Sequence, residues 1–199
     1  SGSSPILEQT VLALTGLDIA VTRNGTELWH LAGYVFAGGL LVGSAATVPG
    51  HELVHHKKKR LDWFMGNWMM AFTWDSAFAI EHVQGHHKNV GLPSDPATAK
   101  RGDGLYKFFI RSSIQEHRDA WQIEGARLKK RSQYFLSYHN QLIQGYARSA
   151  LITAIIFLIS GWNGVFMFLG IAVFAKLFLE TVNYMEHYGL VPVSYTHLR

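Results

Sequence analysis

Histidines gather at three places along this chain, and their spacing is suited to holding metal ions. The first cluster is HELVHH at residues 51–56, the second is EHVQGHH at residues 81–87, and the third is NYMEHYG at residues 183–189. Imidazole is the commonest metal ligand among side chains, and two histidines four residues apart on a helix point toward the same ion. The three clusters therefore predict a metal-dependent enzyme.

The relative directions of the histidines predict more than one ion. On a regular helix each residue advances by about 100°, so His51 and His55 lie about 40° apart, and His82 and His86 repeat that relation. His87 lies roughly 140° from His82 and is expected to aim at a different ion. Three glutamates next to or one turn from these histidines, and one asparagine of the third cluster, are expected to orient the imidazoles: Glu52, Glu81, Glu186 and Asn183.

The absence of cysteine narrows the metal chemistry. With no cysteine among 199 residues, thiolate zinc sites, cysteine-ligated iron–sulfur clusters and haem-thiolate chemistry are excluded, so nitrogen and oxygen remain as ligands. The length is enough for one domain, which we place at residues 1–190. Residues 191–199 continue no pattern and are expected to be a non-native tail.

Long apolar runs beside the clusters predict membrane-spanning helices. Residues 28–50 contain no Asp, Glu, Lys or Arg, and a run of this length crosses about 30 Å of hydrocarbon as a helix. A second uncharged run at residues 149–175 is divided by the turn signal GWNG at residues 161–164. We expect a hairpin from about residue 141 to about residue 183. The run at residues 6–21 is a weaker candidate, because Glu8 and Asp18 interrupt it.

Basic residues are concentrated in the middle of the chain. Of the 18 Lys and Arg residues, 14 lie between Lys57 and Arg131, and basic loops stay in the cytoplasm. We interpret the runs KKKR at 57–60 and KKR at 129–131 as solvated or headgroup-facing rims rather than a nucleic-acid site.

Residues 61–80 are long enough to cross a membrane, but a crossing would separate the first two histidine clusters. Asp62, Asn67 and Asp75 interrupt this segment, so we expect it to lie in the interface or to re-enter and return. Residues 106–128 predict a helical, membrane-proximal cap. The predicted fold is all-α: a multi-pass transmembrane helical bundle with a cytosolic histidine-rich di-metal site and that cap.

The motifs HELVHH, EHVQGHH and NYMEHYGL closely resemble the histidine boxes of the integral-membrane alkane 1-monooxygenases, which are relatives of the membrane fatty-acid desaturases. The segment GLPSDPATAKRGDGLYKFF after the second box also resembles the linker of that group, and the resemblance covers roughly residues 30–190. Position by position it implies that the metal ligands are His51, His55, His82, His86, His87 and His187. His56 has no firm counterpart, and we interpret it as a rim residue that remains a further candidate ligand.

The resemblance implies a non-haem di-iron centre with two ferrous ions, on the cytosolic side of a bacterial inner membrane. The implied reaction uses O₂ to hydroxylate the terminal methyl of a medium- or long-chain alkane, or a similar fatty-acyl-type apolar substrate, to a primary alcohol. Because the chain has no flavin motif and no cysteine, electrons are expected from rubredoxin and its NADH-dependent reductase. The family also has earlier helices and a later His-x-x-His-His box, so we expect this chain to be an internal fragment that is inactive alone.

Three alternatives remain open at this point. A fatty-acid desaturase or an aromatic-methyl (xylene-type) hydroxylase of the same superfamily would share the di-iron centre. A membrane zinc protease would use the H-E-x-x-H pattern of residues 51–55 with Glu52 as general base, but it gives no reason for the second cluster. A membrane metal carrier would place its ligands along a pore rather than at one end of several helices.

Overall fold

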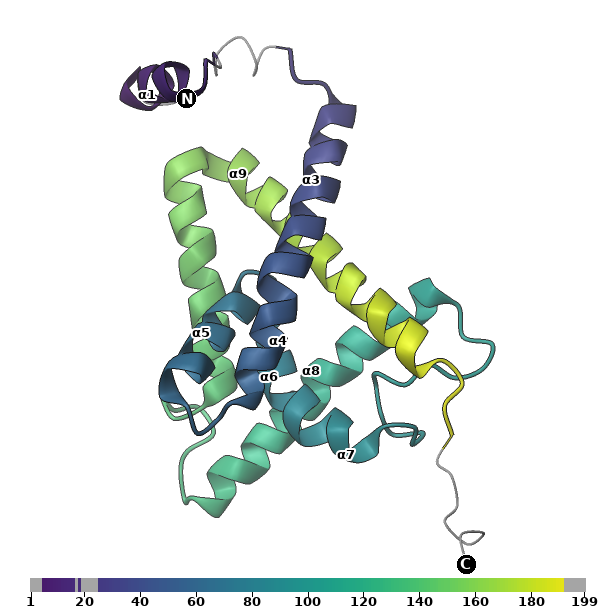
Figure 1. The fold of residues 1–199 in the computed structure, drawn as a ribbon. Coiled ribbons are helices and arrows are strands. Elements are labelled where there is room, and N and C mark those ends of the chain that lie inside the picture. The colour runs from purple at the N-terminus through teal and green to yellow at the C-terminus, as the bar shows by residue number, and fades with distance from the viewer. Residues whose placement is uncertain (1–4, 17, 19–24, 192–199) are drawn as a thin grey trace, which may run out of the picture.

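The structure is a computed structural model that describes residues 5–16, 18 and 25–191. Those residues form helices and connecting segments without any strand (Figure 1), which confirms the all-α prediction for this part of the chain. All but Val191 of the predicted tail lies outside the described residues. The elements are α1 Pro5–Thr15, α3 Leu28–Val42, the π-helix η1 Gly43–Thr47, α4 Val48–His55, α5 Arg60–Ala71, α6 Phe78–Glu81, the π-helix η2 His82–His86, α7 His87–Asn89, α8 Leu105–Lys130 and α9 Gln141–His187.

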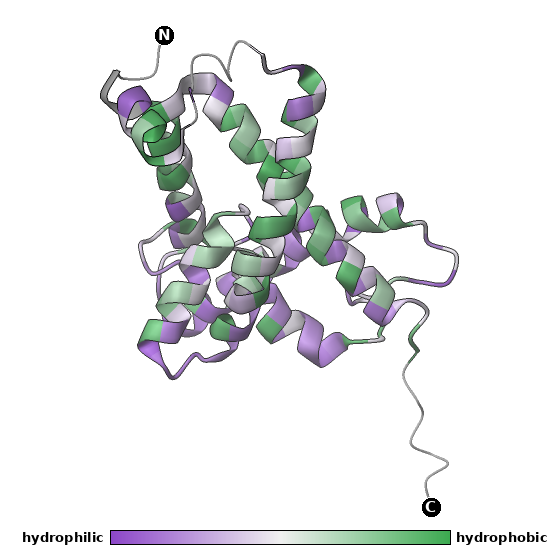
Figure 2. Cartoon of the chain, turned by 45° about the horizontal axis from the view of Figure 1, so that its top comes forward, coloured by the Kyte–Doolittle hydropathy of each residue, from purple (hydrophilic) through white to green (hydrophobic). Residues whose placement is uncertain are grey.

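Two helical stretches are long and apolar enough to cross a membrane: residues 28–55, formed by α3, η1 and α4 without interruption, and α9. Figure 2 shows apolar residues dominating the upper part of these helices. The weaker candidate at residues 6–21 contributes only the 11-residue α1, which is shorter than a span; the rest of that run lies largely outside the described residues.

Helix α9 bends sharply at Gly161, where the predicted turn is present. The backbone there has φ 61° and ψ −159°, a conformation that is essentially limited to glycine. The helix therefore forms two limbs that run in different directions (Figure 1). At its start, the Asn140 side chain caps the first turn by accepting hydrogen bonds from the backbone N–H groups of Leu142 and Ile143.

The second limb of α9 crosses closely against α3. A Cβ atom at Gly39 would lie 2.5 Å from the Phe174 ring, so a residue without a side chain is required for this approach. The crossing brings the end of α4, which carries the first histidine cluster, toward the end of α9, which carries His187.

The segment between the first two histidine clusters returns on itself, as predicted. Helix α5 packs along α4, and the chain then turns through residues 72–77, where Trp74 has φ 56°. Ser149 Oγ donates to the Ala71 carbonyl at 3.0 Å and joins this turn to α9. Helix α6 then leads directly into η2, so that the His82 ring centre lies 4.4 Å from that of His51.

Helix α8 confirms that residues 106–128 are helical, and it lies against α6, η2 and α9 (Figure 1). Its buried Glu124 accepts two hydrogen bonds of 2.6 Å from Arg127 and one of 2.5 Å from the backbone N–H of Gln141. This carboxylate therefore joins the end of α8 to the start of α9.

Candidate metal centre

Four histidines from neighbouring elements converge at one end of the helices. His51 and His55 come from α4, His82 begins η2, and His87 begins α7. Each offers one ring nitrogen that lies within 4.8 Å of the nitrogens of the other three. Imidazole nitrogens bind a metal such as zinc at about 2 Å. Small side-chain rotations that bring the four nitrogens slightly closer together would therefore let them share one ion. We call these residues the four-histidine group.

The membership of His87 in this group corrects the sequence analysis, which assigned it to a different ion from His82. That assignment assumed a regular α-helix, but residues 82–86 are π-helical. Hydrogen bonds in a π-helix connect residues five apart, so His82 and His87 come to the same face. Their ring centres lie 4.6 Å apart.

His86 is instead turned toward His187, and their ring centres lie 4.8 Å apart. The Nδ1 atom of His86 lies 3.0 Å from both carboxylate oxygens of Asp95, and Nδ1 of His187 lies 3.0 Å from the Asn183 carbonyl oxygen. Since these partners accept hydrogen bonds, each Nδ1 donates and each Nε2 keeps a lone pair for a metal. This pair lies beside the four-histidine group.

Asp95 is a site residue that the sequence analysis missed. It is buried and also accepts hydrogen bonds from Thr98 Oγ1 at 2.5 Å and from the Ala97 backbone N–H at 3.2 Å. These contacts hold its carboxylate against His86. The only signal in the sequence is an acidic residue beside a proline soon after the second cluster, and this pattern is common in turns.

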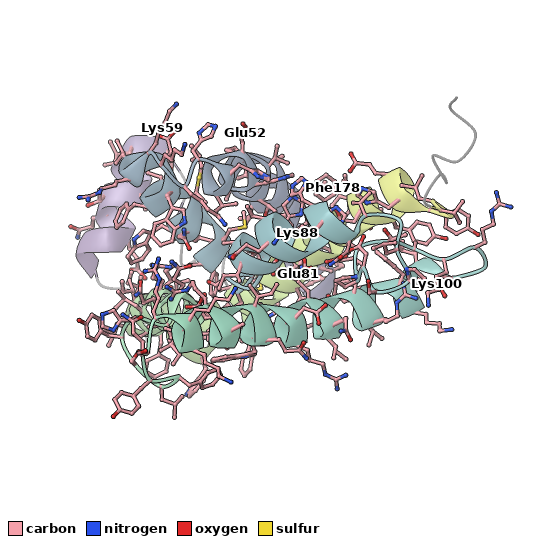
Figure 3. The ribbon with its side chains drawn as sticks, turned by 90° about the horizontal axis from the view of Figure 1, so that it is seen from below. Glu52, Lys59, Glu81, Lys88, Lys100 and Phe178 are labelled. Carbon is pink, nitrogen blue, oxygen red and sulfur yellow. The ribbon has the colours of Figure 1, made fainter. Side chains whose placement is uncertain are left out.

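The four residues predicted to orient the imidazoles lie in different surroundings. Glu52 and Glu186 are exposed, whereas Glu81 and Asn183 are buried. Figure 3 shows Glu52 at the outer edge of the molecule and Glu81 between η2 and α8. The Asn183 side chain donates to Glu180 at 3.4 Å, while its backbone carbonyl meets His187.

His56 lies outside the four-histidine group, and its ring contacts two carboxylates. Its Nδ1 lies 2.8 Å from Asp62, and its Nε2 lies 3.5 Å from Glu52. The interpretation of His56 as a rim residue rather than a ligand stays a prediction. The exposed Glu52 thus faces His56, which removes the support for a general base at this position in a zinc protease. The gathering of histidines at one end of the helices also disfavours a pore-type metal carrier.

The surroundings of the centre favour neutral imidazoles. Burial, followed by the neighbouring histidines, lowers the pKa of His82 to about 2. Burial, followed by the charge of Asp95, raises the pKa of Glu81 to about 7. Neutral imidazole is the form that binds a metal, so His82 is prepared to bind an ion without losing a proton.

The residues fit a divalent metal. The Nε2 atom of His82 is buried and has no hydrogen-bond partner among the described residues, although an isolated buried polar atom is costly. A metal ion among the four histidines would satisfy it. An all-imidazole donor set is suited to iron, zinc, copper or nickel.

The chain belongs to the fatty acid desaturase family, whose model matches residues 27–199. Two similar proteins are called alkane 1-monooxygenase 2. The one from Alcanivorax borkumensis is 38% identical over 168 residues, which cover 84% of this chain and 44% of that protein. The one from Pseudomonas aeruginosa is 37% identical over 158 residues, covering 79% of this chain and 42% of that protein. The resemblance found in the motifs is thereby confirmed.

A more distant relative is the xylene/toluene monooxygenase hydroxylase component of Pseudomonas putida. It is 28% identical over 185 residues, which cover 91% of this chain and 50% of that protein. The chain therefore spans about half the length, or less, of these curated relatives.

Proposed function

We propose that the protein containing this chain is a membrane-bound di-iron monooxygenase that converts the terminal methyl of medium- or long-chain alkanes to primary alcohols. The observation that carries the proposal is the four-histidine group at the end of apolar helices. It occurs in a chain similar to proteins named alkane 1-monooxygenase. The proposed location is a bacterial inner membrane, with the histidines on the cytoplasmic side.

The two histidine sets would have separate tasks in this proposal. His51, His55, His82 and His87 would hold one iron, and His86 and His187 would contribute nitrogens to a second. Iron would supply the activation of O₂, which side chains alone do not provide. Asp95 would keep the His86 ring in the tautomer whose Nε2 is a ligand.

The apolar helices support an apolar substrate. Large apolar side chains are exposed along α3 and α9, including Phe36, Leu158 and Phe166, and such exposure is stable when lipid covers it. An alkyl chain leaves water for these surroundings at little cost. The same surroundings would exclude bulk water from the reacting carbon.

Electrons would come from rubredoxin and its reductase. The exposed residues Lys129, Lys130 and Arg131 at the end of α8 form a basic surface for an acidic carrier.

Replacing Lys129, Lys130 and Arg131 by glutamine should slow carrier-dependent turnover at low salt, with a smaller difference at high salt, because salt screens exposed charges. The matched control replaces Lys58, Lys59 and Arg60. Equal rates for the wild type and the first variant at low salt would refute this docking surface.

An aromatic-methyl hydroxylase is the second candidate, supported by the similarity to the xylene/toluene enzyme component. It would use the same centre, and the substrate alone would differ. Competition between an alkane and a xylene in one assay separates the two candidates.

The test of the proposed function combines metal content with product analysis. The full-length protein is purified in detergent, its iron and zinc are measured, and 1-alkanols are detected after adding alkane, O₂, NADH, reductase and rubredoxin. We expect about two irons per chain, alcohol formation, and loss of both in His82→Ala but not in His56→Ala. Zinc without an oxygen-dependent product would refute the proposal.

A further inference from the structure

A cluster of buried charges lies close to the metal centre. Lys176 of α9 is 8% exposed and forms ion pairs of 2.8 Å with Asp75 and with Glu180, and a third with Glu116 of α8. Three ionised carboxylates around one ammonium would leave two uncompensated negative charges in the interior, which is costly. One of the carboxyl groups is therefore expected to hold a proton.

That proton belongs on Glu116. The second carboxyl oxygen of Glu116, Oε1, is buried and has no hydrogen-bond partner among the described residues, a setting that disfavours the ionised carboxylate. Burial, followed by the charge of Asp75, raises the pKa of Glu116 well above its usual value. Burial opposes ionisation of Asp75 as well, but the Lys176 ammonium overcomes it and holds the pKa of Asp75 below its usual value.

Glu116 borders one cavity and is joined to a second through Lys176. A small cavity of about 10 Å³, room for about one water molecule, is bordered by Glu116, by Glu180 and by His82 of the four-histidine group. A larger cavity of about 310 Å³ opens between α8 and α9. Its polar lining consists of Thr73, Trp74, Asp75, Ser113, His117, Tyr146 and Lys176. Polar groups thus continue from the surface to the metal centre.

We propose that Glu116 relays protons from the larger cavity to the metal centre. The inference rests on the proposed function, because monooxygenation follows RH + O₂ + 2 e⁻ + 2 H⁺ → ROH + H₂O, with electrons from the external one-electron carrier. His87 is exposed, but His82 and His86 are buried, so a proton that reaches the centre on their side passes through the protein.

Each transfer begins when the O–H bond of Glu116 breaks, its electron pair stays on the carboxylate, and the proton passes through the small cavity to the O₂-derived oxygen that leaves as water. A proton arriving through the larger cavity, past Asp75, then forms a new O–H bond on Glu116. Lys176 and Glu180 remain charged and hold the carboxyl in place. The titratable and charged groups around Glu116 are Asp75 from the turn, Lys176, Glu180 and Tyr146 from α9, Glu81 from α6 and His82 from η2. His117 on α8 itself acts on Asp75.

The first test does not depend on turnover. Infrared spectra of the full-length protein in H₂O and D₂O should show a protonated-carboxyl band that shifts on exchange and is lost in Glu116→Gln. Asp119→Asn is the matched control, because Asp119 is on the same helix and lines neither cavity; it should retain the band. An unchanged band in Glu116→Gln would overturn the assignment of the proton.

The second test uses the iron-loaded enzyme with its carrier. Glu116→Gln should keep its iron, lower the rate roughly tenfold or more, increase the solvent isotope effect and reduce the alcohol formed per NADH consumed. Glu116→Asp retains a carboxyl proton and should recover part of the coupling between NADH consumption and alcohol formation. This variant also replaces Glu116→Gln in the test if the glutamine variant does not fold. A wild-type rate and isotope effect in a folded Glu116→Gln enzyme would refute the relay.

The two proposals fail in different ways. A wild-type protein that forms no alcohol from any alkane or xylene refutes the proposed function, and the infrared comparison still decides whether Glu116 holds an exchangeable proton. An active wild type whose Glu116→Gln variant is fully coupled refutes the relay alone.

Discussion

Asp95 shows how one buried side chain prepares a ligand. Its carboxylate contacts Nδ1 of His86 with both oxygens at 3.0 Å, and Thr98 holds it from the other side. A carboxylate in this position fixes the ring orientation and raises the basicity of the other nitrogen. The metal affinity of His86 therefore depends on a residue that need not touch the ion.

Asp95→Asn should weaken metal binding by about 10- to 100-fold, because the amide removes the negative charge and one acceptor. The measurement is a competition titration of the metal against a chelator. Asp62→Asn is the control, since Asp62 makes a similar contact of 2.8 Å with His56 outside the four-histidine group. Equal affinity in Asp95→Asn and the wild type would contradict this role.

Glu116 should also shape the pH dependence of stability. Its pKa is raised in the folded state. At a pH above the ordinary glutamate pKa, the folded state therefore keeps a proton that the unfolded state has released. Stability should therefore fall as pH rises above about 4.5, by up to about 1.4 kcal/mol per pH unit. Glu116→Gln cannot release this proton and should flatten the decline in thermal-unfolding curves recorded from pH 5 to pH 8. Parallel curves would contradict the raised pKa.

At the scale of elements, departures from regular helix set the geometry of the site. The π-helix η2 places His82 and His87 on one face. The break at Gly161 divides α9 into two limbs, and the second limb ends with His187. Residues 82–86 are π-helical and Gly161 has a non-helical backbone, so a regular α-helix at either place would put the histidines elsewhere.

Gly161→Ala should destabilise the protein by about 1–3 kcal/mol, because alanine is strained at this backbone conformation. Thermal unfolding in detergent measures the effect. Gly33→Ala is the control: it lies within α3, and a Cβ there meets no atom within 4 Å, so it should be neutral or slightly stabilising. Equal melting temperatures for the two variants would show that the bend tolerates a side chain.

At the scale of the whole molecule, the apolar helices end where the histidines gather. Residues 28–55 and the second limb of α9 both finish at the metal centre. The segment between the first two histidine clusters returns instead of crossing. The arrangement predicts that both ends of this segment lie on the same side of a membrane as the histidines, with the α9 bend on the other side.

Cysteine labelling tests this topology. These 199 residues contribute no cysteine to the background, and any cysteine elsewhere in the full-length protein is first replaced by serine. In inverted inner-membrane vesicles containing the full-length protein, Lys58→Cys and Val90→Cys should react with an impermeant maleimide. Trp162→Cys, beside the bend and exposed, should react only after the vesicles are opened. Protection of just one of the first two positions would show that the segment between them crosses.

The sequence by itself determined the histidine clusters, the apolar runs, the turn near Gly161 and the family, because each is a local pattern readable within a short stretch. Only the tertiary structure decided how the histidines divide into two sets, since a π-helix changes the direction of His87. It alone identified Asp95 as the partner of His86. The contact between Lys176 and Asp75 joins residues 101 positions apart, and no local pattern pairs buried charges across such a separation. Their pairing follows from the crossing of the helices, which close packing such as that of Phe174 against Gly39 stabilises.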